Sequence, residues 1–424
     1  MLKIIKKDKI EAEIKLLKEK SGIQLDLPQE KAVREIIRNV RDKKDRALIE
    51  YTKKFDKVSL EADEIKVSEQ EIKEAYGKVN SAYLEALKDA IRNIGAYHER
   101  QKISPVKIQT NDKLLTLRSL ALGRVGVYVP GGKASYPSSV LMNVIPAQIA
   151  GVPQIILCSP PPIASSILVA ASELGITDIY RAGGAQAIAA MAFGTEIIPA
   201  VDKIVGPGNI YVMLAKKLLY GVVGIDSLAG PSDVLIVADE SANARYVAID
   251  LIAQAEHDSD ASAIVITTSE KLASEIDAAA TELVKEFERK KIIEASFKEN
   301  GRIFCVESLE IAAVLANRIA PEHLEIIVSD PQLILDTVRN AGAVFIGPYS
   351  PVAIGDYLAG PNHTLPTAGT SRFSSLLTVY DFLKHQSVTG YSKEALRTDR
   401  DSAVTLAEIE GLDAHARAID IRFS

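Results

Sequence analysis

Short apolar runs alternate with amphipathic stretches over residues 123–346, and this alternation constrains the fold more than any other feature of the sequence. The runs are rich in Ile, Val and Leu without intervening polar residues, as in Val125–Val129, Gln154–Cys158 and Ala263–Thr267. Such runs are typical of parallel strands that are covered on both faces. The regular alternation with helical patterns predicts right-handed βαβ units and an α/β fold.

The alternation forms two blocks of similar size, residues 123–220 and 234–346. No convincing residue-level repeat relates them, so an internal duplication stays an open question. In the second block we expect helices at 242–256, 270–293, 309–319 and 331–339. The strands expected between them are 234–237, 263–267, 303–306, 324–328 and 344–346.

The flanking segments carry helical patterns. Residues 1–20 predict an exposed amphipathic helix, and 31–55 and 69–101 repeat apolar residues at helical spacing. Ser68 with Glu71 resembles a capping box for the latter. Residues 105–122 look extended. After Asn362, a loop rich in Gly, Ser, Thr and Pro is expected to lead into a helical tail.

Composition excludes several classes of protein. The net charge of -6 disfavours a general nucleic-acid binder, and the lack of Trp with only 5% aromatic residues disfavours a base-stacking platform. The two cysteines, Cys158 and Cys305, lie in apolar runs and are expected to be buried strand residues. No signal peptide or membrane span is expected, so we predict a cytoplasmic protein without nucleic-acid or membrane partners.

The six histidines are unevenly distributed, since five of them follow residue 256. His257 ends a predicted helix one turn after Gln254, and Glu322–His323 form an acid–base dipeptide just before a predicted strand. Each of these residues also has a non-functional interpretation: His257 as the end of a helix, and Glu322–His323 as a dipeptide in a surface loop. His98 and His385 lie in polar helical contexts and are interpreted as non-functional.

Two further segments and two glycine turns hold candidate site residues. Residues 355–363 include Asp356 and His363 among Gly and Pro, which predicts an irregular binding loop. Residues 410–417 contain Glu410 and His415 and would ordinarily form a surface helix. The turns Pro130-Gly131-Gly132 and Gly206-Pro207-Gly208 each follow a strand and lead into a helix, which is a weak phosphate-site signal.

A zinc site is one hypothesis that these residues allow. If His257, Asp356 and His415 converge, they offer two imidazoles and a carboxylate, which suit Zn²⁺ and leave room for a substrate. Gln254 would be an unusual fourth ligand. The long separations along the chain do not establish this convergence.

The chain resembles the histidinol dehydrogenase family over residues 124–417. The resemblance rests on a series of motifs in the family's order, namely residues 127–132, 183–187, 202–209, 229–232, 254–258, 320–325, 355–366 and 410–416. These motifs together are highly specific, whereas the N-terminal helices are less distinctive.

The resemblance implies a set of site residues. It assigns catalysis to Glu322 and His323, and NAD⁺ contacts to Tyr128, Gln186 and Asn209. One zinc ion per subunit would be held by Gln254, His257, Asp356 and His415. The implied substrate contacts are Ser232, Gln254, His257, His323, Asp356, His363, Glu410 and His415.

The resemblance also implies an architecture. Two Rossmann-like α/β domains with parallel sheets are expected, with small helical segments at both termini. The implied division is an N-terminal segment 1–24, a discontinuous zinc and catalytic domain 25–122 and 232–377, an inserted NAD-binding domain 123–231, and a helical tail 378–424. In the implied homodimer this tail reaches the partner's active site.

The implied reaction is the four-electron oxidation of L-histidinol through L-histidinal to L-histidine with two NAD⁺, the last two steps of histidine biosynthesis. Three alternatives stay open: a related dehydrogenase for another amino alcohol or a sulfonated diol, a metal- or nucleotide-sensing module, and a zinc hydrolase. The complete match of Glu410 and the zinc set argues against the first of these.

Overall fold

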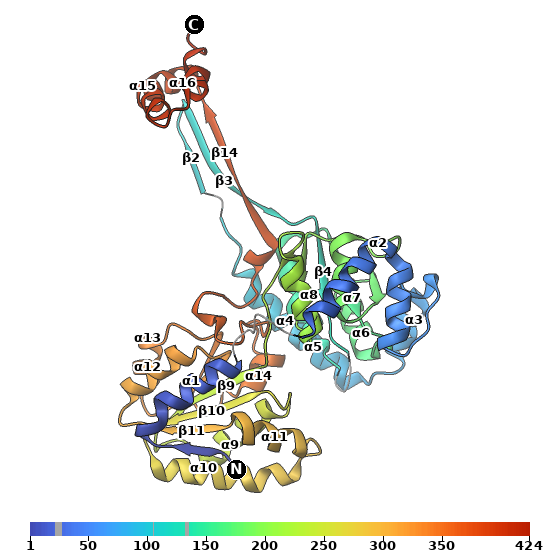
Figure 1. Ribbon diagram of the computed structural model, residues 1–424, viewed down its shortest axis with the longest axis vertical. Helices are drawn as coiled ribbons and strands as arrows, with labels where there is room; N and C mark the ends of the chain where they lie inside the picture. Colours follow the sequence, from blue (N-terminus) through green and yellow to red (C-terminus); the bar gives the residue numbers. More distant parts are fainter. Residues whose placement is uncertain (22–27, 105, 132–134) are drawn as a thin grey trace. The chain divides into compact units, whose positions relative to one another are not determined.

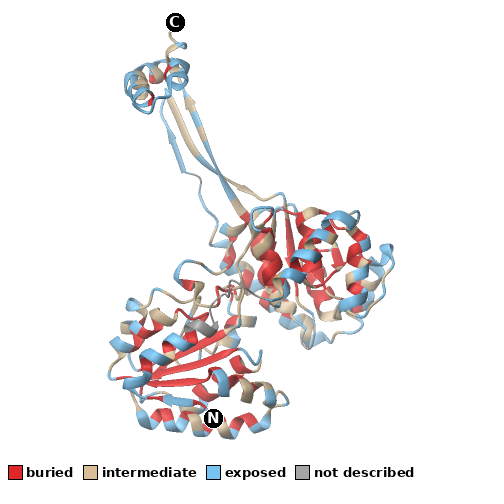
Figure 2. Ribbon diagram, viewed as in Figure 1, coloured by how far each residue is buried: buried red, intermediate tan, exposed pale blue. Residues whose placement is uncertain are grey.

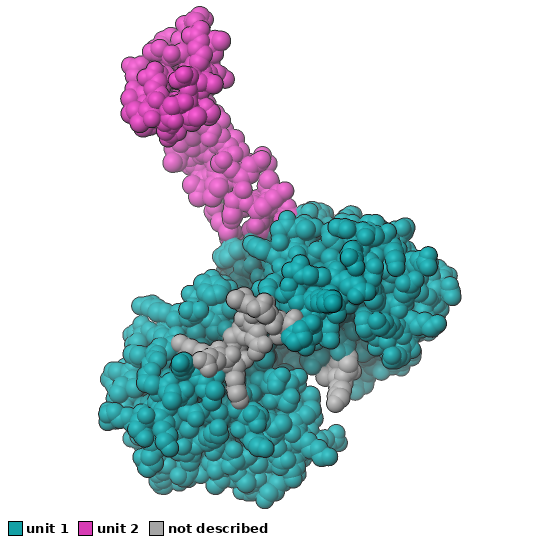
Figure 3. Space-filling view, viewed as in Figure 1, with its two compact units in different colours: residues 1–101, 123–382 teal, residues 102–122, 383–424 magenta. Residues whose placement is uncertain are grey.

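The structure is a computed structural model that describes residues 1–21, 28–104, 106–131 and 135–424. Two compact units are present (Figure 3): residues 1–101 with 123–382, and residues 102–122 with 383–424. Each unit is described by itself. None of the helices in the described ranges combines the length and apolar character that a membrane span requires.

A six-stranded parallel sheet forms one half of the first unit (Figure 1). Its strand order is β1-β11-β10-β9-β12-β13. The bounds are β1 Lys3–Ile5, β9 Asp233–Ala238, β10 Ser262–Thr267, β11 Arg302–Cys305, β12 His323–Ile327 and β13 Ala343–Ile346. All residues of β9, β10, β11 and β12 are buried, which explains why these runs are mostly apolar rather than alternating (Figure 2).

A five-stranded parallel sheet forms the other half, in the order β6-β5-β4-β7-β8. Its strands are β4 Arg124–Tyr128, β5 Gln154–Ser159, β6 Ile179–Arg181, β7 Lys203–Val205 and β8 Gly224–Ile225. When β1 is left aside, each sheet has five strands. Numbered along the chain, they lie side by side in the order third, second, first, fourth, fifth. Strand β1 is added at one edge of the larger sheet. This shared topology was not visible in the residues, and the α/β prediction with parallel sheets is confirmed.

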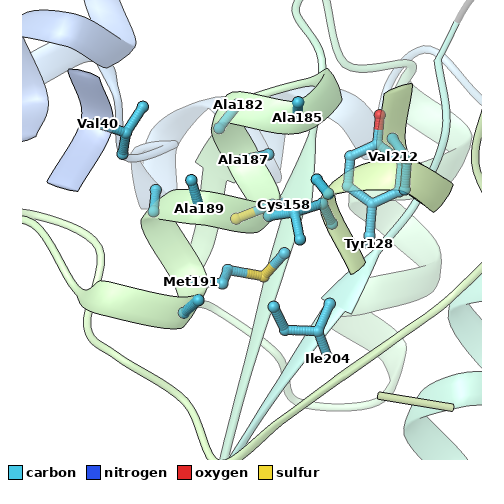
Figure 4. Packing of buried hydrophobic residues seen from close by; sticks show 14 of the residues in the cluster. Val40, Tyr128, Cys158, Ala182, Ala185, Ala187, Ala189, Met191, Ile204 and Val212 are labelled. Carbon is cyan, nitrogen blue, oxygen red and sulfur yellow. The ribbon is translucent and has the colours of Figure 1, made fainter. Parts of the chain in front are cut away.

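Helices cover both faces of each sheet. In the larger sheet, α9 Ala244–Ala255, α10 Glu270–Leu283 and α11 Lys290–Asn300 pack on one face. The other face is covered by α1 Ile10–Ser21, α12 Leu309–Ile319 and α13 Pro331–Thr337. One face of the smaller sheet packs against α2 Glu30–Phe55, α7 Gly184–Phe193 and α8 Ile210–Leu219, in the core shown in Figure 4.

The remaining helices of the first unit are α3 Glu69–Tyr76, α4 Ser81–Glu99, α5 Pro137–Ala150, α6 Ser165–Glu173 and α14 Val352–Tyr357. The capping box at Ser68 is confirmed, because its hydroxyl accepts the Glu71 N–H and the Glu71 carboxylate accepts the Ser68 N–H. Both cysteines are buried, as expected. Burial raises the pKa of the Cys158 thiol, which makes it a poor nucleophile.

The second unit contains a three-stranded antiparallel sheet in the order β14-β3-β2 and two helices. The bounds are β2 Val106–Gln109, β3 Lys113–Ala121, β14 Leu383–Tyr391, α15 Lys393–Ile409 and α16 Asp413–Asp420. Among its described residues only Ala395, Ala407 and Ala416 are buried. Three buried alanines do not amount to a hydrophobic core of the unit's own.

Several local expectations were wrong. The first residues of the chain form strand β1 before helix α1, because β1 completes the edge of the larger sheet. The helix expected at 69–101 is divided at residues 77–80, where Asn80 caps α4, and the helix expected at 270–293 is divided before α11. The tail expected to be wholly helical begins with β14, so His385 lies in a strand.

The division into four segments stays a prediction, and its boundary at residues 24 and 25 lies outside the described residues. The structure separates a first unit and a second unit at residues 101–102, 122–123 and 382–383. These points coincide with the entry to and exit from the antiparallel sheet.

A buried ion pair fixes the turn after β7. The Lys216 ammonium donates to a carboxylate oxygen of Asp226 at 2.6 Å and to the Gly206 carbonyl at 2.5 Å. The second Asp226 oxygen accepts the Gly206 N–H at 2.7 Å. Gly206 has φ +111°, and a Cβ there would lie 2.1 Å from the Tyr128 carbonyl oxygen, so only glycine fits.

We expect Lys216→Met to destabilise the first unit by about 3–5 kcal/mol, because the Asp226 carboxylate would remain buried without a counter-charge. Chemical unfolding measures this change. As a control, Glu275→Ala breaks the exposed Lys271–Glu275 pair and should cost less than about 1 kcal/mol. Equal effects of the two substitutions would contradict the assigned role of the buried pair.

Candidate active site

The Glu322–His323 pair lies at the amino-terminal edge of the six-stranded sheet. His323 is the first residue of β12 and pairs in register with Val234 of the neighbouring strand β9. Ser232 lies just before β9, so the starts of the two central strands bring these residues together. Ligands of open α/β sheets ordinarily bind at the carboxyl ends of the strands, and this cluster uses the opposite edge.

Asp233, which the sequence did not single out, locks Glu322 in place. The Glu322 carboxylate accepts the Asp233 N–H at 3.1 Å, and the Asp233 carboxylate accepts the Glu322 N–H at 2.8 Å. The Ser232 hydroxyl also hydrogen-bonds the Glu322 carboxylate. These contacts orient both acids, which are almost fully buried.

His323 is held in one tautomer. Its Nδ1 lies 3.0 Å from the Asp233 carbonyl oxygen, which can only accept, so Nδ1 carries the proton and Nε2 is the free base. Burial lowers the pKa of His323 to about 4, against the opposing effect of the Asp233 hydrogen bond. His257 and His363 lower it further. The ring is therefore neutral at pH 7 and able to accept a proton.

Glu322 has the opposite shift. Burial first, and then the negative charge of Asp233, raise the pKa of Glu322 well above its usual value, and Asp356 adds to this effect. The hydrogen bonds to Asp233 and Ser232 oppose the shift without cancelling it. A neutral imidazole and a carboxyl group with a raised pKa thus lie side by side, 3.9 Å apart.

Helix α9 ends close to the same sheet edge; it carries Gln254, and His257 follows directly after its C-cap. Gln254 is buried in the last turn, and the His257 N–H donates to the Gln254 carbonyl at 3.3 Å. The His257 side chain reaches solvent, yet desolvation by the surrounding protein lowers its pKa. Its charge affects the pKa of both His323 and His363, which places these three imidazoles in one neighbourhood.

Asp356 and His363 come from the segment that the sequence predicted to be irregular. That prediction was wrong for its first part, because Asp356 lies in the short helix α14. Gly355 makes this packing possible, since a Cβ there would lie 2.5 Å from the Phe345 ring. Nδ1 of His363 lies 4.0 Å from the Asp356 carboxylate. Burial raises the pKa of Asp356 to about 6 and lowers that of His363 to about 4.

A buried polar contact anchors the segment that bears His363. Nδ2 of Asn362 donates to the Met142 carbonyl at 2.6 Å and lies 3.2 Å from Nε2 of His98. Asn93, on the same helix as His98, donates to the Leu358 carbonyl at 3.0 Å. His98 is fully buried rather than polar and exposed, so helix α4 holds the segment next to the site.

A second carboxyl pair connects α9 with α14. Glu325 on β12 accepts the Val352 N–H at the start of α14 at 2.9 Å, and its side chain also meets Asp250 of α9. Burial and the Asp250 charge raise the pKa of Glu325 to about 8. Glu325 therefore joins α9, which leads to His257, with α14, which carries Asp356. No local pattern in the sequence indicated this role.

The three residues implied to contact NAD⁺ lie at the carboxyl edge of the five-stranded sheet. The Tyr128 hydroxyl, at the end of β4, accepts the Gly184 N–H at 3.0 Å, and Gln186 is buried in the first turn of α7. Asn209 caps α8 by accepting the N–H groups of Tyr211 and Val212. The strand order reverses between β4 and β7, where such sheets bind ligands. Gly132 lies outside the described residues.

Glu410 and His415 belong to the second unit, so the structure does not bring them together with the residues above. Within that unit they line an open hollow of about 740 Å³. Its walls are largely apolar side chains of α15, of α16 and of the turn between them, namely Leu396, Leu406, Leu412 and Ile419.

Donor chemistry in the first unit fits a zinc ion in part. Gln254, His257 and Asp356 supply an amide, an imidazole and a carboxylate, which are N and O donors that Zn²⁺ accepts. Among the described residues, no three His, Cys, Asp or Glu side chains are grouped closely enough to hold a metal ion. The fourth implied ligand, His415, lies in the other unit.

The fold and the site define an α/β protein with two parallel sheets and a buried acid–base pair. A family model described as histidinol dehydrogenase matches residues 21–423. The chain is 51% identical over 419 residues to the histidinol dehydrogenase of Bacillus thuringiensis subsp. konkukian (strain 97-27), covering 98% of this chain and 97% of the relative. It is 52% identical to that of Caldanaerobacter subterraneus subsp. tengcongensis over 397 residues, or 93% and 92% of the two chains.

A solved structure supports the same conclusion. The crystal structure of histidinol dehydrogenase from Elizabethkingia anophelis matches with a TM-score of 0.94 and 36% identity, covering 100% of this chain and 98% of that chain. The chain therefore belongs to the histidinol dehydrogenase family and is an oxidoreductase.

We expect His98→Gln to reduce the acid sensitivity of the fold. Burial lowers the pKa of His98 to about 4 from 6.5, so the unfolded chain takes up a proton that the folded protein excludes as the pH falls through 6.5 toward 4. Wild type should lose about 2 kcal/mol more than the variant between pH 7 and pH 5. Urea unfolding at both pH values measures this difference.

The amide oxygen of Gln can accept the Asn362 N–H in place of Nε2, so the variant should fold. His385→Gln changes an exposed histidine of β14 and is the matched control. If both variants follow the wild-type pH profile, the buried neutral state of His98 is contradicted.

Proposed function

We propose that the protein catalyses the zinc- and NAD-dependent oxidation of L-histidinol, through L-histidinal, to L-histidine, the last two steps of histidine biosynthesis. The names of the relatives support the substrate. The observation that carries the chemistry is the buried Glu322–His323 pair, in which His323 is neutral and has a free Nε2.

In the first oxidation, Nε2 of His323 takes the proton of the substrate hydroxyl. NAD⁺ supplies a hydride acceptor for the carbon of the alcohol. The low pKa of His323 keeps this nitrogen unprotonated at neutral pH, and the Asp233 carbonyl holds the ring in the orientation that the transfer needs.

In the second oxidation, Glu322 takes a proton from the water that adds to the aldehyde carbon, and His323 takes a proton from the resulting diol. The raised pKa makes the ionised Glu322 a stronger base than an exposed glutamate. Two adjacent groups with opposite pKa shifts suit two successive deprotonations.

The zinc ligands in this proposal are Gln254, His257, Asp356 and His415, with one ion per subunit. Zn²⁺ supplies an anchor for the imidazole and amine nitrogens of the substrate, which it binds well. Ser232, His363 and Glu410 complete the substrate contacts. Burial of Gln254 and the support of α14 by Glu325 keep the ligands of the first unit in place.

The cofactor contacts in this proposal are Tyr128, Gln186 and Asn209. Their location beside the strand-order reversal of the five-stranded sheet supports this assignment. The fixed turn at Gly206, which leads to Asn209, brings the backbone close to the Tyr128 carbonyl at the end of β4.

We further propose a cytoplasmic homodimer with active sites shared between subunits. The support is the second unit, in which only three alanines are buried among the described residues. A second copy would cover its apolar side chains, and His415 and Glu410 would then act in the partner's site. In this arrangement residues 1–24, 25–122 with 232–377, 123–231 and 378–424 are the four functional segments.

The yield of NADH per histidinol consumed tests the reaction. We expect a ratio near two that a chelator abolishes, and His323→Asn should lower turnover by at least about 100-fold while zinc content is unchanged. His385→Asn is the matched control. A ratio near one, or NADH formation from another alcohol but not histidinol, would replace the proposed substrate, and hydrolysis without NADH would replace the reaction class.

Mixing two inactive variants tests the shared site. Under conditions that exchange subunits, His323→Asn and His415→Asn proteins should together regain activity, because a mixed dimer would contain one site with both native residues. Steady-state turnover after mixing measures the recovery, which should reach about a quarter of the wild-type value. Absence of recovery, when exchange is shown by a tagged subunit, would count against sharing.

A further inference from the structure

Asp56 carries a carboxylate oxygen that no residue in the described part of the chain satisfies. The residue follows α2 as its C-cap and is only partly exposed. Its Oδ2 is shielded from solvent and has no hydrogen-bond partner among the described residues. The neighbouring Lys57 does not neutralise it, because the Lys57 ammonium donates to the Lys54 carbonyl at 2.8 Å. A buried, unsatisfied acceptor is costly and indicates a function outside the folding of the chain.

The Asp56 carboxylate lies at the carboxyl edge of the five-stranded sheet. A Cβ on Gly183, which follows β6, would lie 3.4 Å from Oδ1 of Asp56 and 2.6 Å from Cβ of Pro160, which follows β5. The Asp56 charge also acts on the hydroxyl of Tyr128 at the end of β4. The carboxylate is therefore close to the carboxyl ends of three adjacent strands, β4, β5 and β6. Strands β5 and β6 lie on one side of the point where the strand order reverses, between β4 and β7.

The strand order explains what such a group would bind. In dinucleotide-binding sheets an acidic residue near the end of the second strand accepts the 2′-hydroxyl of the adenosine ribose. Here the second strand is β5, which ends in Ser159, followed by Pro160. Neither can supply a carboxylate. Asp56, at the end of α2, places a carboxylate at the same edge of the sheet. It is far from β5 along the sequence, so the sequence did not reveal that it can replace an acidic residue at the end of β5.

We propose that Asp56 binds the 2′-hydroxyl of the adenosine ribose of NAD⁺ and thereby selects NAD⁺ over NADP⁺. This inference rests on the proposed cofactor. A carboxylate accepts hydrogen bonds from a sugar diol and repels a 2′-phosphate. Gly183 packs closely against Pro160 beside Oδ1, and a side chain at this position would clash with Pro160.

Titration calorimetry of the full-length protein with NAD⁺ and NADP⁺ tests the inference. Asp56→Asn should weaken NAD⁺ binding by at least about tenfold and should not weaken NADP⁺ binding, so that the preference for NAD⁺ falls by about tenfold or more. Histidinol binding should be unchanged. Asp42→Asn, which alters an exposed carboxylate of the same helix, should leave both affinities at the wild-type values.

A cofactor analogue tests the same contact in the unaltered protein. NAD⁺ lacking the 2′-hydroxyl of the adenosine ribose should bind the wild type about tenfold more weakly than NAD⁺ does. The difference between NAD⁺ and the analogue should be smaller in Asp56→Asn, because the uncharged amide oxygen of Asn accepts only a weaker hydrogen bond from the hydroxyl. Equal binding of NAD⁺ and the analogue by the wild type overturns the inference even if the variant fails to fold.

The outcomes separate this inference from the proposed function. If the wild type oxidises histidinol with NAD⁺ and Asp56→Asn keeps the wild-type preference between the two cofactors, the assignment of Asp56 is wrong and the reaction stands. If the wild type binds no NAD⁺, the proposed cofactor is wrong, and the assignment of Asp56 fails with it.

Discussion

The parallel pairing of β9 with β12 is the constraint on which the site depends. It places the first residues of two buried strands next to each other, so that Asp233 and Glu322 can hold each other's N–H groups. The same pairing directs the Asp233 carbonyl to Nδ1 of His323. A main-chain carbonyl therefore fixes the tautomer of His323, and Nδ1 needs no side-chain hydrogen-bond partner. The acid–base pair is as rigid as the centre of the sheet.

The two sheets share a strand order but use opposite edges. In the five-stranded sheet, Tyr128, Gln186 and Asn209 lie at the carboxyl edge, where the strand order reverses between β4 and β7. The six-stranded sheet closes its equivalent crevice with Asp239, whose carboxylate accepts hydrogen bonds from the N–H and hydroxyl groups of both Ser241 and Ser329. The buried Glu322–His323 pair lies at its amino edge instead. Sheets with the same strand order can thus place candidate site residues at either the carboxyl or the amino edge, and the loops determine which edge is accessible.

Much of the fold could be predicted from the sequence, because buried parallel strands produce uninterrupted apolar runs. The strand order could not, since it depends on which strands within each block pair with each other, and similar apolar runs do not specify these pairs. At the site, Glu322 and His323 were visible as a local pair. Asp233 was not, because a single acid at the start of an apolar run has no distinguishing neighbour. His98 looked polar from its helix, and only the fold shows that Asn362 satisfies its Nε2.

Strand β14 has a consequence for the solubility of the chain. It pairs with β3 along its whole length, from Leu383 opposite Ala121 to Tyr391 opposite Lys113. Without it, β3 and β2 would form a two-stranded hairpin with a long open edge, and Val106, Ile108 and Leu117 are already exposed on those strands. Such edges recruit strands from other molecules. A chain truncated before residue 383 would therefore be prone to aggregate, even though the residues of both parallel sheets are intact.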